Sequence, residues 1–196
     1  SNPTVKVVVI EGSGKGFCAG HDLREMRSRT DETFHQTIFA ACSKLMLTVT
    51  DLPQPVIAKA HGIATAAGCQ LVATVDLAVA ADDTRFGTPG VNIGLFCSTP
   101  MVAVSRAIPR KQVMEMLLTG EMIDAGTAVA HGLINHAVPE TELEDAVQEM
   151  AGKIASKSRL VLKTGKKAFY RQLEMTLPDA YAYTSQVMVD NMQARD

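Results

Sequence analysis

Apolar residues fall along the chain in two kinds of segment: short β-branched or alanine-rich runs, and longer stretches with helical periodicity. The short runs predict strands over residues 5–10, 56–60, 76–81, 84–87 and 133–138. The periodic stretches predict helices over residues 23–29, 31–49, 64–74, 99–107, 111–118, 124–131, 142–156, 159–172 and 178–192. Pro53 and Pro55 are expected to end the second of these helices, because proline cannot continue a helical backbone.

Strands that alternate with helices favour an α/β fold with parallel pairing over an α+β arrangement. A length of 196 residues suits about one domain, and no internal repeat or low-complexity linker divides it. The last third of the chain is mainly helical, with Leu143, Val147, Met150 and Ile154 on one face. These helices are expected to form a separate layer or an oligomer contact, and the pattern leaves both open.

Composition excludes several classes of protein. A hydrophobic fraction of 46% is too high for a disordered chain. The 19 Lys and Arg against 21 Asp and Glu give a net charge of -2, which argues against a nucleic-acid binder. No apolar run approaches the roughly 20 residues of a membrane span, and no signal-peptide pattern opens the chain. We therefore expect neither nucleic acid nor a membrane among its partners.

Cysteines and histidines show no metal-binding spacing. The 4 cysteines contain no C-x-x-C pair, and the 5 histidines contain no H-E-x-x-H motif. We expect reduced thiols and no metal ion. The residues concerned are Cys18, Cys42, Cys69, Cys97, His21, His35, His61, His131 and His136.

The glycine-rich segment after the first predicted strand suggests a phosphate loop, but its spacing is wrong. A P-loop requires glycine where Val9 stands and serine or threonine where Gly16 stands. A dinucleotide fingerprint that starts at Gly12 requires glycine where Phe17 stands. The segment therefore predicts a flexible turn rather than a nucleotide site.

Two separated segments carry the strongest functional signal: residues 15–26 read KGFCAGHDLREM, and residues 61–71 read HGIATAAGCQL. Further motifs follow in order at residues 76–78 (DLA), 86–89 (FGTP), 115–120 (EMLLTG), 130–134 (AHGLI) and 138–139 (VP). With these motifs the chain resembles the crotonase superfamily, the enoyl-CoA hydratase/isomerase family, from about Val5 to its C-terminus. Within that family it is most similar to the subgroup of enoyl-CoA hydratase domain-containing protein 3 and its bacterial relatives.

The resemblance implies the crotonase (ClpP/crotonase-like) fold, an α/β architecture. Repeated ββα units would form a spiral core over residues 1–140, and residues 141–196 would form a helical region for a homotrimer or homohexamer. Typical members have extra N-terminal strands and another C-terminal helical stretch, so we expect this chain to lack both. The resemblance also implies a lyase-type enzyme of fatty acid metabolism, cytoplasmic in a bacterium and mitochondrial in a eukaryote.

Acyl-CoA chemistry gives these motifs a physical meaning. A thioester that exchanges an α-proton or loses a carboxylate passes through an enolate, and two backbone N–H groups can stabilise its oxygen. By the resemblance, the two donors are the N–H groups of His21 and Ala67. The family usually has glycine where Ala67 stands, and alanine can still donate if its φ stays negative. If Ala67 begins a helix, the helix dipole adds to the stabilisation.

The resemblance also implies residues that bind coenzyme A, which enters as part of the substrate with no separate cofactor required. Lys15 and Arg24 stand where the family often contacts the nucleotide end, and Phe17 and Ala19 belong to the same motif. Cationic side chains suit the phosphates of coenzyme A. Any one of them is also explained as a solvated surface charge.

The sequence departs from the family at the two acids that hydration needs. Hydration of an enoyl thioester uses two glutamates around one water, and the resemblance places them at Gln70 and Gly90. Neither glutamine nor glycine can act as a general acid or base near neutral pH, so ordinary enoyl-CoA hydration is not expected.

Three alternatives remain open from the residues alone. His21 can assist another enolate reaction, such as acyl-CoA decarboxylation or hydrolysis, because histidine titrates near neutrality. Cys97 or Ser98 can act as a nucleophile only if a base lies nearby, and no motif supplies one. The chain can also be a non-catalytic acyl-CoA binder or regulatory subunit. Asp22 and Glu25 stand at positions that the family uses structurally.

Overall fold

The computed structural model describes residues 4–194. Residues 1–3, at the start of the predicted core, and residues 195–196, at the end of the predicted helical region, lie outside the described residues. The strands are β1 (Val8–Glu11), β2 (Val56–Ala60), β3 (Ile63–Thr65), β4 (Leu77–Ala81), β5 (Arg85–Gly87), β6 (Ile123–Asp124) and β7 (His136–Val138). The α-helices are α1 (Leu23–Ser28), α2 (Glu32–Asp51), α3 (Ala67–Thr74), α4 (Pro100–Ala107), α5 (Arg110–Thr119), α6 (Ala125–His131), α7 (Leu143–Ala155), α8 (Arg159–Gln172) and α9 (Leu177–Gln193), with 3-10 turns η1 (Pro89–Ile93) and η2 (Glu140–Glu142).

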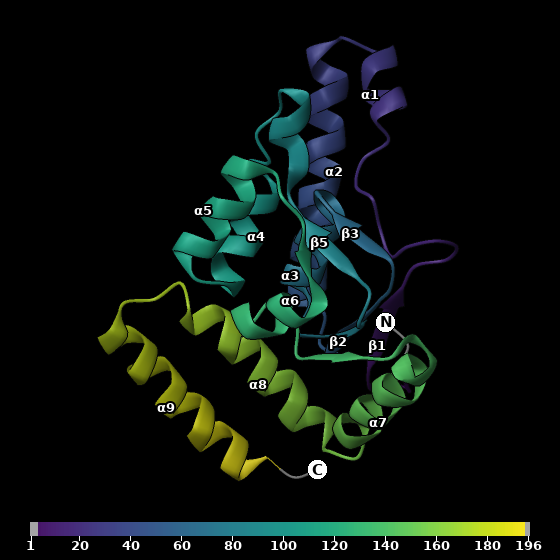
Figure 1. The fold of residues 1–196 in the computed structure, drawn as a ribbon. Helices are drawn as coiled ribbons and strands as arrows, with labels where there is room; N and C mark the ends of the chain where they lie inside the picture. The colour runs from purple at the N-terminus through teal and green to yellow at the C-terminus, as the bar shows by residue number, and fades with distance from the viewer. Residues whose placement is uncertain (1–3, 195–196) are drawn as a thin grey trace.

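Two small sheets form the centre of the molecule (Figure 1). One sheet has the order β1-β2-β4-β7 and is parallel throughout, which confirms the predicted α/β class. The other has the order β3-β5-β6, with β3 and β5 parallel and β6 antiparallel to β5. Each parallel connection needs a crossover segment, and α2 and α3 supply those that follow β1 and β3.

Alternating side chains of β2 and β4 enter two separate cores. Ala58 and Ala80 belong to the larger core, in which α3 contributes Cys69 and Val72. The opposite face is covered by α7, whose residues pack against the other set of strand residues. That second core consists of Ile57, Val79, Ala81, Leu143 and Val147. A strand that is buried on both faces must be apolar nearly throughout, as the sequence VIAKA of β2 is.

The predicted helices agree closely with the structure. The sequence did not predict the short strands β3 and β6, and it placed the start of β7 too early. Residues 64–66, predicted as the start of a helix, instead continue β3 and turn, because Ala64 and Thr65 pair with Phe86 and Gly87 of β5. Helix propensity is a weak preference that such tertiary pairing overrides. β6 was not predicted, and β7 begins at His136 rather than at residue 133.

A buried polar cluster attaches α8 to the core. Lys166 Nζ donates to Asp76 Oδ2 at 2.7 Å and to the carbonyls of Val49 and Gln54 at 3.0 Å each. Tyr170 donates its hydroxyl to Asp76 Oδ1 at 2.8 Å. Burial raises the pKa of Tyr170, and the Asp76 carboxylate raises it further, so the phenol stays protonated. These contacts hold the end of α2, the start of β4 and α8 together.

The C-terminal helices form a hairpin along one side of the molecule, with α9 packed against α8 (Figure 1). The predicted boundary between residues 140 and 141 falls in η2, and α7 beyond it packs directly on β2 and β4. The division into a core and a helical region stays a prediction. Within residues 4–194, no helix combines the length and the hydropathy that crossing a bilayer requires.

Candidate active site

The two sequence motifs lie side by side, although residues 27–60 separate them in sequence. Cys18 N–H donates to the Ile63 carbonyl at 3.1 Å, and Thr65 N–H donates to the Cys18 carbonyl at 3.0 Å. Phe17 N–H donates to the His61 carbonyl at 2.9 Å. Residues 17 and 18 of the first motif therefore lie alongside β3, with an isolated parallel bridge between Cys18 and Ala64.

A strained turn connects β3 to α3. Ala66 adopts φ 50° and ψ -114°, a conformation that strongly favours glycine. Its N–H donates to the Gly87 carbonyl at 2.9 Å, and its carbonyl accepts from Gln70 N–H at 2.9 Å. Ala67 is the first residue of α3, and among the described residues Ala66 is the one non-glycine residue with positive φ. The strain therefore falls on Ala66, and Ala67 keeps the negative φ that the donor position requires.

Gly20 brings the first motif directly onto this turn. It has φ +97°, and a Cβ placed on it would lie 3.1 Å from Ala66 Cβ and 3.4 Å from Ala67 N. The peptide that carries the His21 N–H follows Gly20, so the predicted donors His21 and Ala67 lie on adjoining segments. Neither N–H has a hydrogen-bond acceptor among residues 4–194. The N–H of Ala67 also lies at the positive end of α3.

His21 is half-buried beside this pair. Its ring packs edge-on against Phe39 of α2, with ring centroids 5.5 Å apart. Burial lowers the pKa of His21, because the charged imidazolium loses part of its hydration. The side chain is therefore neutral at pH 7.

Gln70, at the first acid position, is buried on α3 with 4% of its surface exposed. Cys42 Sγ donates to Gln70 Oε1 at 3.7 Å, which orients the amide toward α2. Burial raises the pKa of Cys42, so that thiol remains a donor. An amide held in this way contributes hydrogen bonds but cannot exchange a proton.

Gly90, at the second acid position, has no room for a side chain. A Cβ on Gly90 would overlap the Leu95 carbonyl oxygen and lie 2.8 Å from Cys97 Sγ. The segment that follows folds back over it, with Leu95 N–H donating to the Gly90 carbonyl at 3.0 Å. The position at which the resemblance places the second acid therefore has no acid side chain, and the space beside Gly90 is filled by other atoms of the chain.

The residues considered as nucleophiles have no base beside them among the described residues. Burial raises the pKa of Cys97, and it raises that of its neighbour Cys69 to about 12. Both therefore remain neutral thiols at pH 7. Ser98 is exposed, and its hydroxyl donates to the Phe96 carbonyl at 3.3 Å.

The residues predicted to bind coenzyme A belong to the first motif and differ in how much of each side chain is exposed to solvent. Lys15, Ala19 and Arg24 are exposed, and neither cation forms an ion pair with a described residue. Phe17 is 7% exposed and its side chain belongs to the larger core. Asp22 caps α1 by accepting from Arg24 N–H at 2.8 Å, which gives it the structural role expected from the resemblance.

Sequence reasoning missed Thr65, whose hydroxyl donates to the Ala19 carbonyl at 3.1 Å and joins the two motifs. It also missed the packing of Cys97 against Gly90. A threonine inside an alanine-rich segment carries no local signal of such a bond. The contact becomes visible only when residues 19 and 65 are placed side by side.

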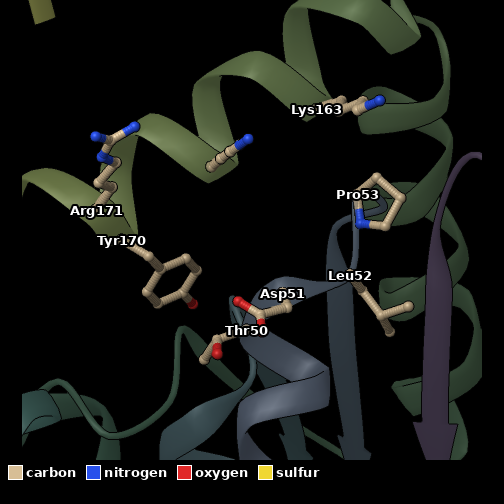
Figure 2. Close-up of a pocket in the computed structure, with 8 residues that line it drawn as sticks. Thr50, Asp51, Leu52, Pro53, Lys163, Tyr170 and Arg171 are labelled. Atoms are coloured by element: carbon tan, nitrogen blue, oxygen red, sulfur yellow. The ribbon is translucent and has the colours of Figure 1, made fainter. Parts of the chain in front are cut away.

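A cavity of about 600 Å³ opens elsewhere, between α8 and the end of α2 (Figure 2). Figure 2 shows Tyr170 pointing toward Thr50 and Asp51, while Arg171 points away from them. None of the predicted site residues lines this cavity. Among the described residues, no group of three or more histidine, cysteine, aspartate or glutamate side chains could hold a metal ion.

Comparisons with known proteins agree with the predicted fold and family. The model of the enoyl-CoA hydratase/isomerase family matches residues 1–196, and the chain belongs to this family, with the predicted crotonase fold. Human enoyl-CoA hydratase domain-containing protein 3, mitochondrial, is 52% identical over 192 residues, which cover 98% of this chain and 63% of that protein. The corresponding Xenopus laevis protein is 49% identical, over 100% of this chain and 66% of its own length. The chain thus spans somewhat less than two thirds of these curated relatives.

Solved structures give the same result. An enoyl-CoA hydratase from Mycobacterium smegmatis superposes with a TM-score of 0.95 at 50% identity, covering 96% of this chain and 74% of that one. The crystal structure of human enoyl-CoA hydratase domain-containing protein 3 also gives a TM-score of 0.95 at 50% identity, over 99% and 78% of the two chains. The predicted resemblance to this subgroup is confirmed.

Proposed function

We propose that this protein binds an acyl-CoA thioester and holds its carbonyl oxygen between the N–H groups of His21 and Ala67. The observation that carries the proposal is the close approach of Gly20 to the Ala66–Ala67 turn, which juxtaposes two N–H groups without acceptors in the described part of the chain. Membership of the enoyl-CoA hydratase/isomerase family supports a thioester as the ligand. Coenzyme A enters as part of that ligand.

In this proposal the backbone supplies the chemistry. When the α-carbon loses or gains a bond, negative charge develops on the thioester oxygen, and preorganised N–H donors stabilise it. The start of α3 adds the positive end of its dipole at the same place. The exposed side chains of Lys15 and Arg24 supply positive charge for phosphate groups near the first motif.

Efficient hydration is not part of the proposed activity. Gln70 cannot exchange a proton, and Gly90 is closed by Leu95 and Cys97. Losing one general acid or base removes roughly 10²–10⁴ in rate. We therefore propose an acyl-CoA binder that hydrates crotonyl-CoA far more slowly than an enzyme with two acids.

Calorimetry tests the binding directly. Crotonyl-CoA is compared with the butyl thioether of coenzyme A, which keeps the nucleotide and pantetheine but has no carbonyl oxygen. The thioester should bind about tenfold more tightly, as expected for hydrogen bonds to a carbonyl oxygen that the thioether lacks. Equal affinities would contradict the proposed carbonyl site, and hydration of crotonyl-CoA at the rate of ordinary hydratases would contradict the proposed lack of acids.

A second candidate is a decarboxylation, favoured by the neutral, half-buried His21 beside the two donors. Decarboxylation requires an oxyanion site and a desolvated carboxylate, and no protein acid at Gln70 or Gly90. Malonyl-CoA and methylmalonyl-CoA should then lose carbon dioxide, and His21→Ala should slow the reaction. No product from these substrates or from acyl-CoA hydrolysis, together with tight thioester binding, would leave a non-catalytic binder as the function.

The predicted homotrimer or homohexamer is supported by apolar residues exposed on the α8–α9 hairpin. Leu177, Tyr181 and Met192 are 71%, 68% and 81% exposed, which is unusual for large apolar side chains on one surface. Light scattering would measure the assembly directly, and a monomer at micromolar concentration would contradict it.

A further inference from the structure

Residues 19–21, which lead to the His21 N–H, form few hydrogen bonds with the described part of the chain. Cys18 before them pairs with β3, and Asp22 after them caps α1. Between these two points, the described part of the chain provides a single hydrogen bond, from Thr65 Oγ1 to the Ala19 carbonyl at 3.1 Å. The position of the His21 N–H therefore depends on Thr65 more than on any other polar group described.

The same threonine lies directly before the second donor. Thr65 is the last residue of β3, two residues before Ala67, just as Ala19 lies two residues before His21. Its own N–H is fixed by the Cys18 carbonyl at 3.0 Å. A Cβ on Gly20 would lie 3.3 Å from the Thr65 carbonyl, so the two segments are in close contact here. One side chain thus links the peptides that precede both donors.

We infer that Thr65 is a positioning residue, whose hydroxyl sets the separation of the two N–H groups that hold the thioester oxygen. Thr65 is 7% exposed and does not itself reach a reacting atom in this account. Without its hydroxyl, the loop at residues 19–21 keeps the close packing of Gly20 but loses its polar anchor. Oxyanion donors act only at short, fixed distances, so a small shift of His21 weakens the pair. The inference rests on the proposed function.

Thr74 provides a matched control. It is also 7% exposed, and its hydroxyl also donates to a backbone carbonyl, that of Gln70, at 2.7 Å. Thr74 ends α3 and does not contact the loop at residues 19–21. Thr65→Val and Thr74→Val therefore remove the same kind of hydrogen bond, and only the first removes the link between the donors. Thr65→Ser keeps the hydroxyl, and Thr65→Ala removes it without the bulk of valine.

The test measures the carbonyl stretch of crotonyl-CoA labelled with 13C at the thioester carbon, free and bound, by infrared difference spectroscopy. In the wild-type protein, binding should lower the stretching frequency, because the donors polarise the carbonyl. Thr65→Val and Thr65→Ala should lose most of that shift and about three- to tenfold in thioester affinity, while Thr65→Ser and Thr74→Val retain both. The butyl thioether should bind all variants equally.

The outcomes distinguish the positioning role of Thr65 from the proposed carbonyl site itself. A wild-type shift that persists in Thr65→Val and Thr65→Ala would overturn the positioning role and leave the carbonyl site intact. A bound thioester without any shift in the wild-type protein would overturn the proposed site and the role of Thr65 with it. If Thr65→Val does not fold, Thr65→Ala gives the same decision. A loss that Thr65→Ser fails to rescue would also count against the hydroxyl.

Discussion

The turn that carries the proposed donors and the predicted positions of the two acids respond differently to substitution. At the turn the proposed function belongs to the backbone, so alanine can stand where the resemblance implies glycine and the N–H groups remain. At Gln70 and Gly90, where the resemblance places the two acids, the expected function belongs to side chains, and neither replacement can exchange a proton. Backbone chemistry therefore survives sequence change that side-chain chemistry does not. Four substitutions test this contrast.

The largest effect is expected for Gly90→Glu. This variant places a glutamate where the resemblance implies one, but the structure has no space for its side chain. Its Cβ would overlap the Leu95 carbonyl, a backbone atom that cannot move aside cheaply. We expect a loss of about 3 kcal/mol in the free energy of unfolding, measured by urea denaturation, and no gain in crotonyl-CoA hydration. Gly152→Glu is the control, because no atom lies within 4 Å of a Cβ there and glutamate favours its helix. Equal stability of both variants would contradict the closure at Gly90.

Gly20→Ala should have the next largest effect, on binding in addition to stability. The added methyl group would press on Ala66 and on Ala67 N at a backbone φ of +97°, and so would separate the donors. Thioester affinity should fall about tenfold by calorimetry. Gly132→Ala pays a similar conformational cost at φ +82°, but its nearest neighbour is 3.9 Å away at Ala107, outside the site. If both variants bind crotonyl-CoA like the wild type, the donor pair is not where the ligand sits.

Ala66→Gly should stabilise the protein, which is unusual for a substitution to glycine. Ala66 has φ 50° and ψ -114°, and such strain costs about 1–3 kcal/mol. After the larger entropy loss of glycine on folding, we expect a gain of about 1 kcal/mol and a Tm about 2–4 °C higher. Ala182→Gly, at an exposed position of α9, should have the opposite sign. A lower Tm for Ala66→Gly would show that the turn is not strained.

The smallest effect concerns the pH dependence contributed by His21. Burial lowers its pKa in the folded state, so the unfolded chain binds the extra proton first as the pH falls. The contribution of His21 therefore favours folding above its unfolded pKa of about 6.5 and turns unfavourable as the pH drops through the folded pKa. The stability difference between wild type and His21→Gln should shift in favour of the variant below pH 6. A difference that is independent of pH would rule out this burial effect.

Much of the fold follows from the sequence because its long elements carry strong local patterns. The predicted strand at residues 56–60 and helix at residues 159–172 coincide with β2 and α8. β3 could not be predicted from the sequence, because its three residues lie in an alanine-rich segment whose local propensity favours a helix. Pairing with β5 makes them a strand instead. Patterns of this length are decided by tertiary contacts rather than by propensity.

The candidate site likewise has residues that the sequence indicated and contacts that it did not. The resemblance carried by the motifs indicated His21, Ala67 and the two positions without acids, because each is read from its place in a linear motif. The positive φ of Ala66 and the packing of Cys97 on Gly90 are consequences of chain segments meeting in space, so no local pattern reveals them. The link from Lys166 to Asp76 spans 90 residues and is equally invisible before folding.

The most direct test of the backbone site is a 15N–1H NMR titration that follows the amide signals of His21 and Ala67. Addition of crotonyl-CoA should move both amide proton signals downfield, as expected for new hydrogen bonds to a carbonyl oxygen. The butyl thioether of coenzyme A, which lacks that oxygen, should leave both nearly unmoved while shifting signals near Lys15 and Arg24. Saturating crotonyl-CoA that leaves the two amide signals in place would contradict the account.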